Sequence, residues 1–191
     1  MTRKSLLWLG ALALLAAVTA PLAGQRPQTR EGFWIGFGFG AGSARESCDG
    51  CSDTTVTGFT GFLKIGGTVT PKLLLAGDVH VWTKDYNPGT EALGSVTMIA
   101  QYYPNVRSGF FVKGGVGFAD YEFTDGARVT GMGPGAILGV GYDIRVARNM
   151  SITPTLDLWH GAVGDLKNGS TLVATGWKQT VFDFNLGVTF H

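Results

Sequence analysis

Charged residues are scarce in this sequence of 191 residues. Lysine and arginine number 15 and aspartate and glutamate 14, so the formal net charge is only +1. A nucleic-acid-binding domain normally carries a clear basic excess, and no nucleic-acid partner is expected here. Prolines number only 7, and the 30 glycines follow no Gly-X-Y period, so the composition indicates neither a proline-rich disordered chain nor a collagen.

Long apolar runs are also missing, except at the N-terminus. A basic start precedes the apolar residues 6–20, and small residues follow them. This run is shorter than the roughly 20 residues of a membrane-spanning helix, and the pattern is typical of a secretory signal peptide. We therefore predict a cleaved signal peptide over residues 1–24, with an uncleaved membrane anchor as the alternative. Gln25 stands where a lipoprotein has its acylated cysteine, so no lipid anchor is expected.

The remaining chain alternates between large apolar residues and small or polar ones. At the C-terminal end, five apolar side chains share one face of the predicted strand: Phe182, Phe184, Leu186, Val188 and Phe190. A period of two residues predicts β-strands rather than helices. Eight segments show it, around residues 33–40, 59–66, 73–82, 95–102, 110–118, 135–143, 152–159 and 181–190.

The composition of the two strand faces predicts which face points inward. One face is apolar, whereas the other carries glycine, serine, threonine and too few charges for a surface in water. Small side chains suit the crowded interior of an eight-stranded barrel, and a large apolar face suits lipid. The sequence thus predicts an all-β fold, an eight-stranded antiparallel up-and-down transmembrane β-barrel over residues 25–191. A lipocalin-like soluble carrier, indicated by Gly32 and Trp34, is the alternative, but it needs an apolar interior and a charged exterior.

The connections between the predicted strands alternate in length. Long loops are expected at 41–54, 83–91, 120–131 and 161–176, and tight turns at 69–72, 104–107 and 145–149. This alternation is typical of long extracellular loops and short periplasmic turns, with both chain ends in the periplasm.

Three segments carry a resemblance to a known family: GFWIGFGFGAG (32–42), FFVKGGVGFADY (110–121) and VFDFNLGVTF (181–190). With the signal peptide, they resemble the small bacterial outer-membrane β-barrel proteins of the OmpA-barrel and OmpX type. The resemblance implies a monomer in the bacterial outer membrane, among lipid and lipopolysaccharide, with an unknown loop ligand. It also implies that the barrel assembly machinery reads the alternating apolar residues 182–190. The sequence departs from the family pattern in ending on His191, which leaves Phe190 penultimate.

Seven titratable side chains are predicted to face the lumen: Lys64, Asp78, His80, Lys113, Asp143, Asp157 and Asp183. The expected depths place Lys64 near Asp78. They also place Lys113 near Asp143, and Asp157 near Asp183 with His80 across the barrel. We interpret the set as a salt-bridged plug, because buried charges must be paired. A proton-sensing or catalytic acid pair is the alternative, since two close carboxylates share a proton or need a cation.

Cys48 and Cys51 lie in the first predicted loop and are candidates for a local disulfide, as expected in an exported chain. A metal or redox role is the alternative, but zinc needs about four ligands and a redox pair needs a helix N-terminus. The glycines of 131–136 mimic a dinucleotide motif, yet a strand follows them instead of a helix. Neither a metal site nor a cofactor is therefore expected.

No catalytic residue is assigned, and the protein is not expected to be an enzyme. His80 and His160 lack a nearby serine, which weakens the alternative of a lipid A-modifying barrel enzyme. The predicted function is a closed scaffold that interacts through its extracellular loops. A narrow channel or small-molecule conduit remains the main alternative, based on the inward glycines Gly36, Gly38, Gly115, Gly117, Gly139 and Gly141.

Overall fold

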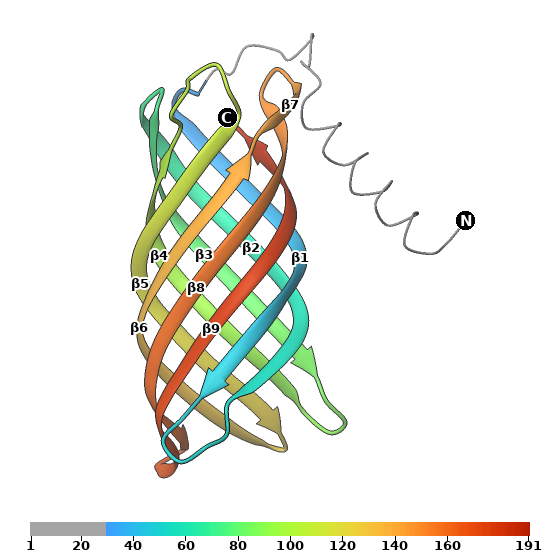
Figure 1. Cartoon of the computed structure of the whole chain (residues 1–191), viewed down its shortest axis with the longest axis vertical. Coiled ribbons are helices and arrows are strands. Elements are labelled where there is room, and N and C mark those ends of the chain that lie inside the picture. The colour runs from blue at the N-terminus through green and yellow to red at the C-terminus, as the bar shows by residue number, and fades with distance from the viewer. Residues whose placement is uncertain (1–29) are drawn as a thin grey trace, which may run out of the picture.

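The computed structural model describes residues 30–191, which form one closed antiparallel sheet (Figure 1). The strands are β1 (Phe33–Ser47), β2 (Thr54–Thr70), β3 (Leu73–Asp85), β4 (Thr90–Tyr102), β5 (Phe110–Asp125), β6 (Ala127–Tyr142), β7 (Ile144–Ala147), β8 (Met150–Asn168) and β9 (Thr171–Phe190). Within the described residues, no helix is long and apolar enough to cross a membrane. The predicted signal peptide over 1–24 lies outside the described residues.

Except for β6 and β7, each strand pairs with its neighbours in sequence, and the first strand also pairs with the last. The sheet order is β6-β5-β4-β3-β2-β1-β9-β8-β7, and an additional β6–β8 pairing closes it. Only Asp143 separates β6 from β7, and both elements pair with β8, so together they form one strand of the wall. The nine strand elements therefore make eight wall strands, and the predicted eight-stranded up-and-down barrel is confirmed.

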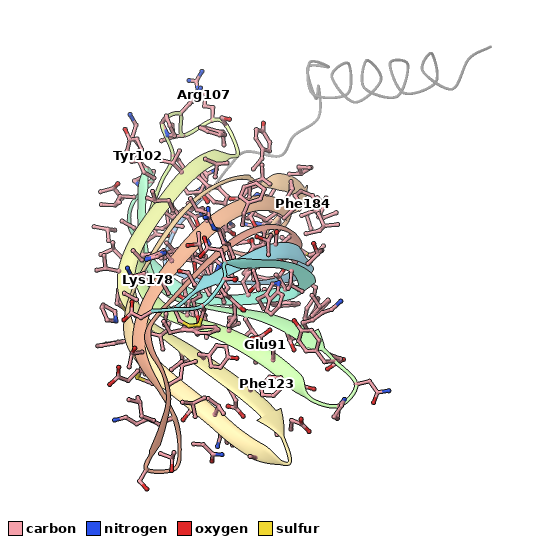
Figure 2. The ribbon with its side chains drawn as sticks, turned by 60° about the horizontal axis from the view of Figure 1, so that its bottom comes forward. Glu91, Tyr102, Arg107, Phe123, Lys178 and Phe184 are labelled. Carbon is pink, nitrogen blue, oxygen red and sulfur yellow. A yellow bond between two sulfur atoms is a disulfide. The ribbon has the colours of Figure 1, made fainter. Side chains whose placement is uncertain are left out.

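The exterior of the barrel is apolar, whereas the interior holds polar and charged side chains together with aromatic and aliphatic ones. Phe39, Val116 and Leu138 are each more than 60% exposed on the outside. Figure 2 shows Tyr102 and Phe184 pointing away from the wall. The prediction that the apolar face points outward is confirmed, and the lipocalin-like alternative, which needs the reverse arrangement, is wrong.

The tight turns predicted at 69–72 and 145–149 are confirmed, with connections at 71–72 and 148–149. The predicted long loops are too long, because the strands are longer than their apolar alternation. The expected loop 120–131 is a hairpin in which Gly126, with φ +65°, alone joins β5 to β6. Most of the expected loop 161–176 likewise belongs to β8 and β9. Conversely, the expected tight turn at 104–107 lies within the longer connection 103–109. We call the outward apolar side chains around the barrel, such as Phe39, Val116 and Leu138, the apolar belt. Beyond this belt the outward residues become polar, so the alternation ends while the backbone pairing continues.

The two ends of the barrel differ (Figure 1). We call the end where β1 begins and β9 ends the terminal end; it also carries the β2–β3, β4–β5 and β7–β8 connections. We call the opposite end the hairpin end; it carries the β1–β2, β3–β4, β5–β6 and β8–β9 connections. In a barrel with periplasmic termini, the hairpin end faces outward from the cell.

Candidate functional site

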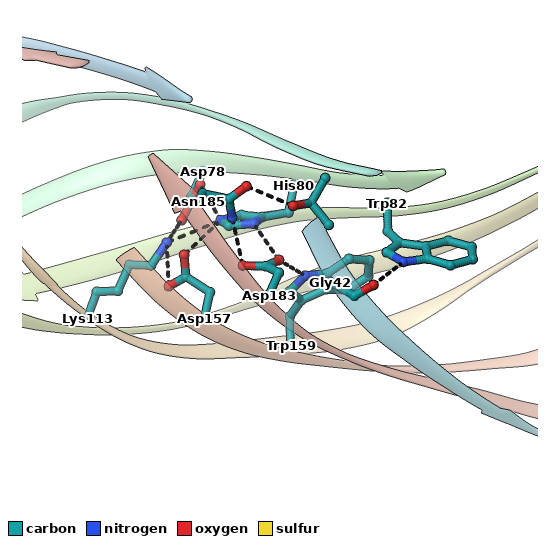
Figure 3. A network of polar contacts seen from close by, with 10 residues as sticks. Gly42, Asp78, His80, Trp82, Lys113, Asp157, Trp159, Asp183 and Asn185 are labelled. Atoms are coloured by element: carbon teal, nitrogen blue, oxygen red, sulfur yellow. Dashed lines mark hydrogen bonds and ion pairs between the residues drawn. The ribbon is translucent and has the colours of Figure 1, made fainter. Parts of the chain in front are cut away.

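Five titratable side chains meet in the middle of the lumen (Figure 3). This group, called here the ionic layer, consists of Asp78 and His80 on β3, Lys113 on β5, Asp157 on β8 and Asp183 on β9. Each is inward because it occupies the alternate position to an apolar, lipid-facing residue. None is more than 4% exposed.

Lys113 is the cation at the centre of the ionic layer. Its Nζ donates to Asp78 Oδ2 at 2.8 Å and lies 3.2 Å from Asp157 Oδ1. The same Nζ is 3.1 Å from His80 Nε2. These contacts join β3, β5 and β8, of which no two are neighbours in the sheet, so they cross the lumen.

His80 connects the lysine to the remaining carboxylate. Its Nε2 is 3.2 Å from Asp78 Oδ1, and its Nδ1 is 3.7 Å from Asp183 Oδ2. Asp183 accepts two further hydrogen bonds from neutral groups, Trp159 Nε1 at 3.0 Å and Asn185 Nδ2 at 2.7 Å. Buried charge in the layer is thus met by both opposite charge and hydrogen-bond donors.

Aromatic rings pack on both sides of the ionic layer. Towards the terminal end, the buried rings of Trp34, Phe62 and Phe111 surround the Lys64 ammonium, with Nζ 4.8 Å from the Phe62 centroid and 5.3 Å from that of Phe111. Towards the hairpin end, the fully buried Trp82 donates from Nε1 to the carbonyl of Gly42 at 3.0 Å. The lumen is therefore filled above and below the charges.

The expected partner of Lys64 forms a different ion pair. Lys64 lies opposite Asp78 in the β2–β3 ladder, but the Asp78 carboxylate pairs with Lys113. Within the described residues, Lys64 Nζ has no hydrogen-bond partner and contacts aromatic faces instead. Strand register brings the two backbones together, whereas side-chain direction selects the partner.

The expected proximity of Lys113 and Asp143 is wrong. Lys113 lies opposite Gly139 in the β5–β6 ladder, four positions nearer the hairpin end than Asp143. Asp143 instead accepts from Tyr103 Oη at 2.7 Å and from Thr153 Oγ1 at 2.8 Å. Asp143 thus belongs to a separate cluster at the terminal end.

Sequence reasoning missed most of this terminal cluster. Arg30 places its guanidinium 3.5 Å above the Tyr103 ring and donates to the Ser108 carbonyl at 2.8 Å. His191 Nε2 lies 3.4 Å from Asp143 Oδ2. Arg30 and Tyr103 lie outside any alternating segment, so no periodic signal marks them. His191 was noticeable only as a departure from the usual aromatic ending.

Asp157 and Asp183 lie opposite each other in the β8–β9 ladder, and His80 approaches both. One ligand atom from each of these three residues lies within 4.8 Å of the others, a spacing that suits a metal ion. Lys113 already places its charge against Asp157 and His80. Lys64, Lys113 and a protonated His80 together would balance the three carboxylates Asp78, Asp157 and Asp183. The arrangement therefore fits an internal ion-pair network without a metal.

The inward glycines allow bulky side chains to fill the lumen. A Cβ built on Gly38 would lie 2.7 Å from Phe62 Cε1, and one on Gly139 would lie 2.9 Å from Lys113 Cε. A Cβ on Gly141 would collide with the ring of Phe111. These three glycines leave room for the neighbouring side chains of Phe62, Lys113 and Phe111.

The other predicted sites lie away from the lumen. A disulfide joins Cys48 and Cys51, with Cα atoms 5.2 Å apart, in the β1–β2 connection at the hairpin end. The five residues of the predicted assembly signal lie on the outward face of β9. Of these, Phe182, Phe184, Leu186 and Phe190 are each at least 39% exposed, and Val188 is half-buried.

The two histidines considered for catalysis occupy opposite sides of the wall. His80 is buried in the ionic layer, whereas His160 is exposed, with Nδ1 2.8 Å from Thr180 Oγ1. Over residues 30–191, neither imidazole is hydrogen-bonded to a serine. The geometry offers no activated serine nucleophile at either histidine.

A closed eight-stranded barrel with an apolar exterior and buried ion pairs has the architecture of bacterial outer-membrane barrels. Neisserial surface protein A has this fold: it is 18% identical, with a TM-score of 0.56 over 85% of this chain and 98% of its own. Ail, the attachment invasion locus protein of Yersinia pestis, is 18% identical, with a TM-score of 0.50 over 84% of this chain and 99% of its own. A complex of Ail with the heparin analogue sucrose octasulfate gives 16% identity and a TM-score of 0.52 over the same shares of the two chains.

No protein-family model matches this sequence, and no curated protein matches it either. The likeness to solved structures nevertheless covers the whole barrel. The chain has the fold of the small outer-membrane β-barrel proteins.

Proposed function

We propose that this protein is an integral outer-membrane barrel with a closed lumen, which acts as a rigid, non-enzymatic scaffold and interacts through its hairpin end. The observation that carries the proposal is the ionic layer. Lys113 is bound to carboxylates from two other strands, and aromatic rings fill the lumen on both sides. Paired charges, with aromatic rings packed on both sides of them, support a lumen that is closed to water and ions.

The exterior supports a location in lipid. The outward apolar side chains form a belt around the barrel, and closure leaves no unpaired strand edge within it. Lipid and lipopolysaccharide would contact this belt, and the barrel would function as a monomer. The barrel assembly machinery would recognise the outward apolar residues of β9 during insertion.

The hairpin end provides the surface for interaction. Its strands continue past the apolar belt, and the β8–β9 hairpin exposes Leu172 by 51% and Val173 by 56%. Apolar side chains exposed together beyond the membrane are typical of contact surfaces. Ail, which is similar in fold, is described as an attachment invasion locus protein.

Ion flux through proteoliposomes tests the closed lumen. Vesicles loaded with potassium chloride and containing the purified protein should retain their contents as long as protein-free vesicles do. Rapid release in the absence of any added ligand would contradict the proposal and favour the conduit. In that event Lys113→Glu should change the rate of release, because the reversed charge lies inside the path.

A further inference from the structure

The connection between β1 and β2, at the hairpin end, is closed on itself by the Cys48–Cys51 disulfide. These four residues form one turn, in which Cys51 N donates to the Cys48 carbonyl at 3.2 Å. Gly50 has a φ of +79° in the third position of the turn, as a type II turn requires. The turn and the disulfide together fix the direction of Asp49, which is the second residue of the turn.

Asp49 reaches out of its own hairpin and contacts β9. Its backbone N donates to the Thr175 carbonyl at 3.0 Å. Its carboxylate oxygen Oδ2 accepts from Thr175 Oγ1 at 3.4 Å. Gly176, with a φ of +65°, lies so close that a Cβ there would collide with the Asp49 carboxylate. We call residues 48–51, which are held against Thr175 and Gly176 in this way, the strap.

The strap contacts the β8–β9 hairpin where the ladder of that hairpin is irregular. Three register shifts interrupt the β8–β9 ladder between Ala162 and Lys167. On the β8 side, β6 pairs with Lys167 and Asn168. On the β9 side, the ladder with β1 ends at Ser47–Lys178, and the strap adds a backbone hydrogen bond beyond that position. The strap therefore supports the side of the hairpin that the β1–β9 ladder no longer reaches.

The same hairpin carries the exposed apolar residues of the proposed interaction surface. Leu172 and Val173 precede Thr175 on β9, and their side chains are 51% and 56% exposed. Cys51 is also exposed, so a thiol in solution has access to the disulfide. The state of the disulfide is thus linked to Leu172 and Val173 through the contact between Asp49 and Thr175.

We propose that the strap is redox-operated: the intact disulfide holds the β8–β9 hairpin in one position, and reduction by a dithiol releases the hairpin with its exposed apolar residues. The inference rests on the proposed role of the hairpin end as the interaction surface. In the reduction, the S–S bond of Cys48 and Cys51 breaks and takes up two electrons and two protons. The dithiol loses both and closes into its own disulfide. Without the covalent ring the turn gains conformational freedom, and Asp49 loses its fixed direction.

Limited proteolysis with trypsin tests the strap, because cleavage after Lys167 requires local opening of the β8–β9 hairpin. The purified protein in detergent is compared in its disulfide form and after reduction with dithiothreitol, alkylation and removal of the reagents. Reduction should make cleavage after Lys167 about threefold to tenfold faster, as expected for loss of the hydrogen bonds at Asp49. Cleavage after Lys84, in the β3–β4 hairpin at the same end, should keep its rate and is the internal control.

Asp49→Pro separates the contact from the disulfide. Proline is favoured in the second position of a type II turn, but it has no N–H to donate to the Thr175 carbonyl. This variant should be cleaved after Lys167 at the faster rate in both redox forms. Asp53→Asn is the matched control on the same connection. Asp53 pairs with Arg45 of β1 at 2.7 Å, so this variant should retain the redox difference of the wild type.

Two results would overturn the proposal: equal cleavage after Lys167 in the oxidised and reduced wild type, or a redox difference that survives in Asp49→Pro. Equal acceleration after Lys84 would also contradict it, since the whole hairpin end would then open. If Asp49→Pro does not fold, Gly176→Ala disturbs the same contact from β9. Ion release from vesicles reports on the lumen alone, so it distinguishes failure of the strap from failure of the closed scaffold.

Discussion

Lys113 forms the shortest ion pair of the ionic layer, at 2.8 Å from Asp78. Its ammonium group is within 3.2 Å of Asp78 and Asp157, and it also approaches His80. Burial of such a group costs free energy unless the partners are well placed, and removal of one partner leaves the others uncompensated. The stability of the barrel should therefore depend on Lys113 more than on any surface charge.

Lys113→Met should lower the free energy of unfolding by about 3–5 kcal/mol, because two carboxylates lose their cation while the chain length is kept. Urea titration in lipid vesicles, followed by tryptophan fluorescence, measures the change. Lys178→Met provides the matched control: Lys178 is exposed at the hairpin end, and the same substitution there should stay within about 0.5 kcal/mol. A loss of less than about 1 kcal/mol at Lys113 would mean that the ionic layer does not hold the strands together.

Gly139 tests how tightly the lumen is filled. A Cβ at this position would collide with Asp157 Oδ1 and approach Lys113 Cε at 2.9 Å. Gly139→Ala should therefore destabilise the barrel by about 1–3 kcal/mol through overpacking. Gly67→Ala is the control, since a Cβ there meets no atom within 4 Å. Equal unfolding curves for the two variants would indicate empty space around the ionic layer.

At the scale of strands, the period-two pattern predicted the faces correctly. Residues such as Phe39 and Val116 contact lipid, and a lipid-facing surface must be apolar, so the sequence records the direction of each side chain. The ends of the strands could not be predicted in this way. Beyond the belt, outward positions such as Arg45 and Lys178 face water, where no alternation is required although the hydrogen-bonded ladder continues.

The same reasoning explains which parts of the lumen could be predicted. Every second residue of a strand points inward, so the alternation alone could place all seven titratable residues on the inner face. Their partners depend on strand tilt and side-chain length, which periodicity does not record. Lys113 therefore reaches across the lumen to Asp78, and Asp143 meets Tyr103 at the terminal end. Glu46 and Glu91, which are also buried inside the barrel, could not be predicted because they lie where the apolar alternation has ended.

The last strand carries a prediction about assembly. Phe190 is outward on β9 and 39% exposed, so its ring contributes little to internal packing. Phe190→Ala should reduce insertion into outer membranes severalfold in cells but leave refolding in detergent unchanged, as expected for a recognition signal. Phe39→Ala is matched in residue type, and its ring is 61% exposed on the neighbouring β1. Equal insertion of both variants, measured by heat-modifiable mobility of membrane fractions, would contradict a special role for the end of β9.

At the scale of the whole molecule, the closed sheet and the side chains packed in the lumen together make the barrel one rigid body. The first and last strands pair over thirteen register positions, from Ile35–Phe190 to Ser47–Lys178, and β6 meets β8 to complete the wall. Inside this wall, the charges are paired in the ionic layer and covered by aromatic rings. Such a molecule can vary its hairpin end without disturbing the part that spans the membrane.

Single-channel recording in planar bilayers tests the closed lumen most directly. With the purified protein inserted, and insertion verified by heat-modifiable mobility of the recovered sample, we expect a silent current trace over a range of voltages. Lys113→Glu, which breaks the ionic layer, should be less stable than the wild type. Reproducible conductance steps from the wild-type protein would contradict the account and make the ionic layer part of a channel.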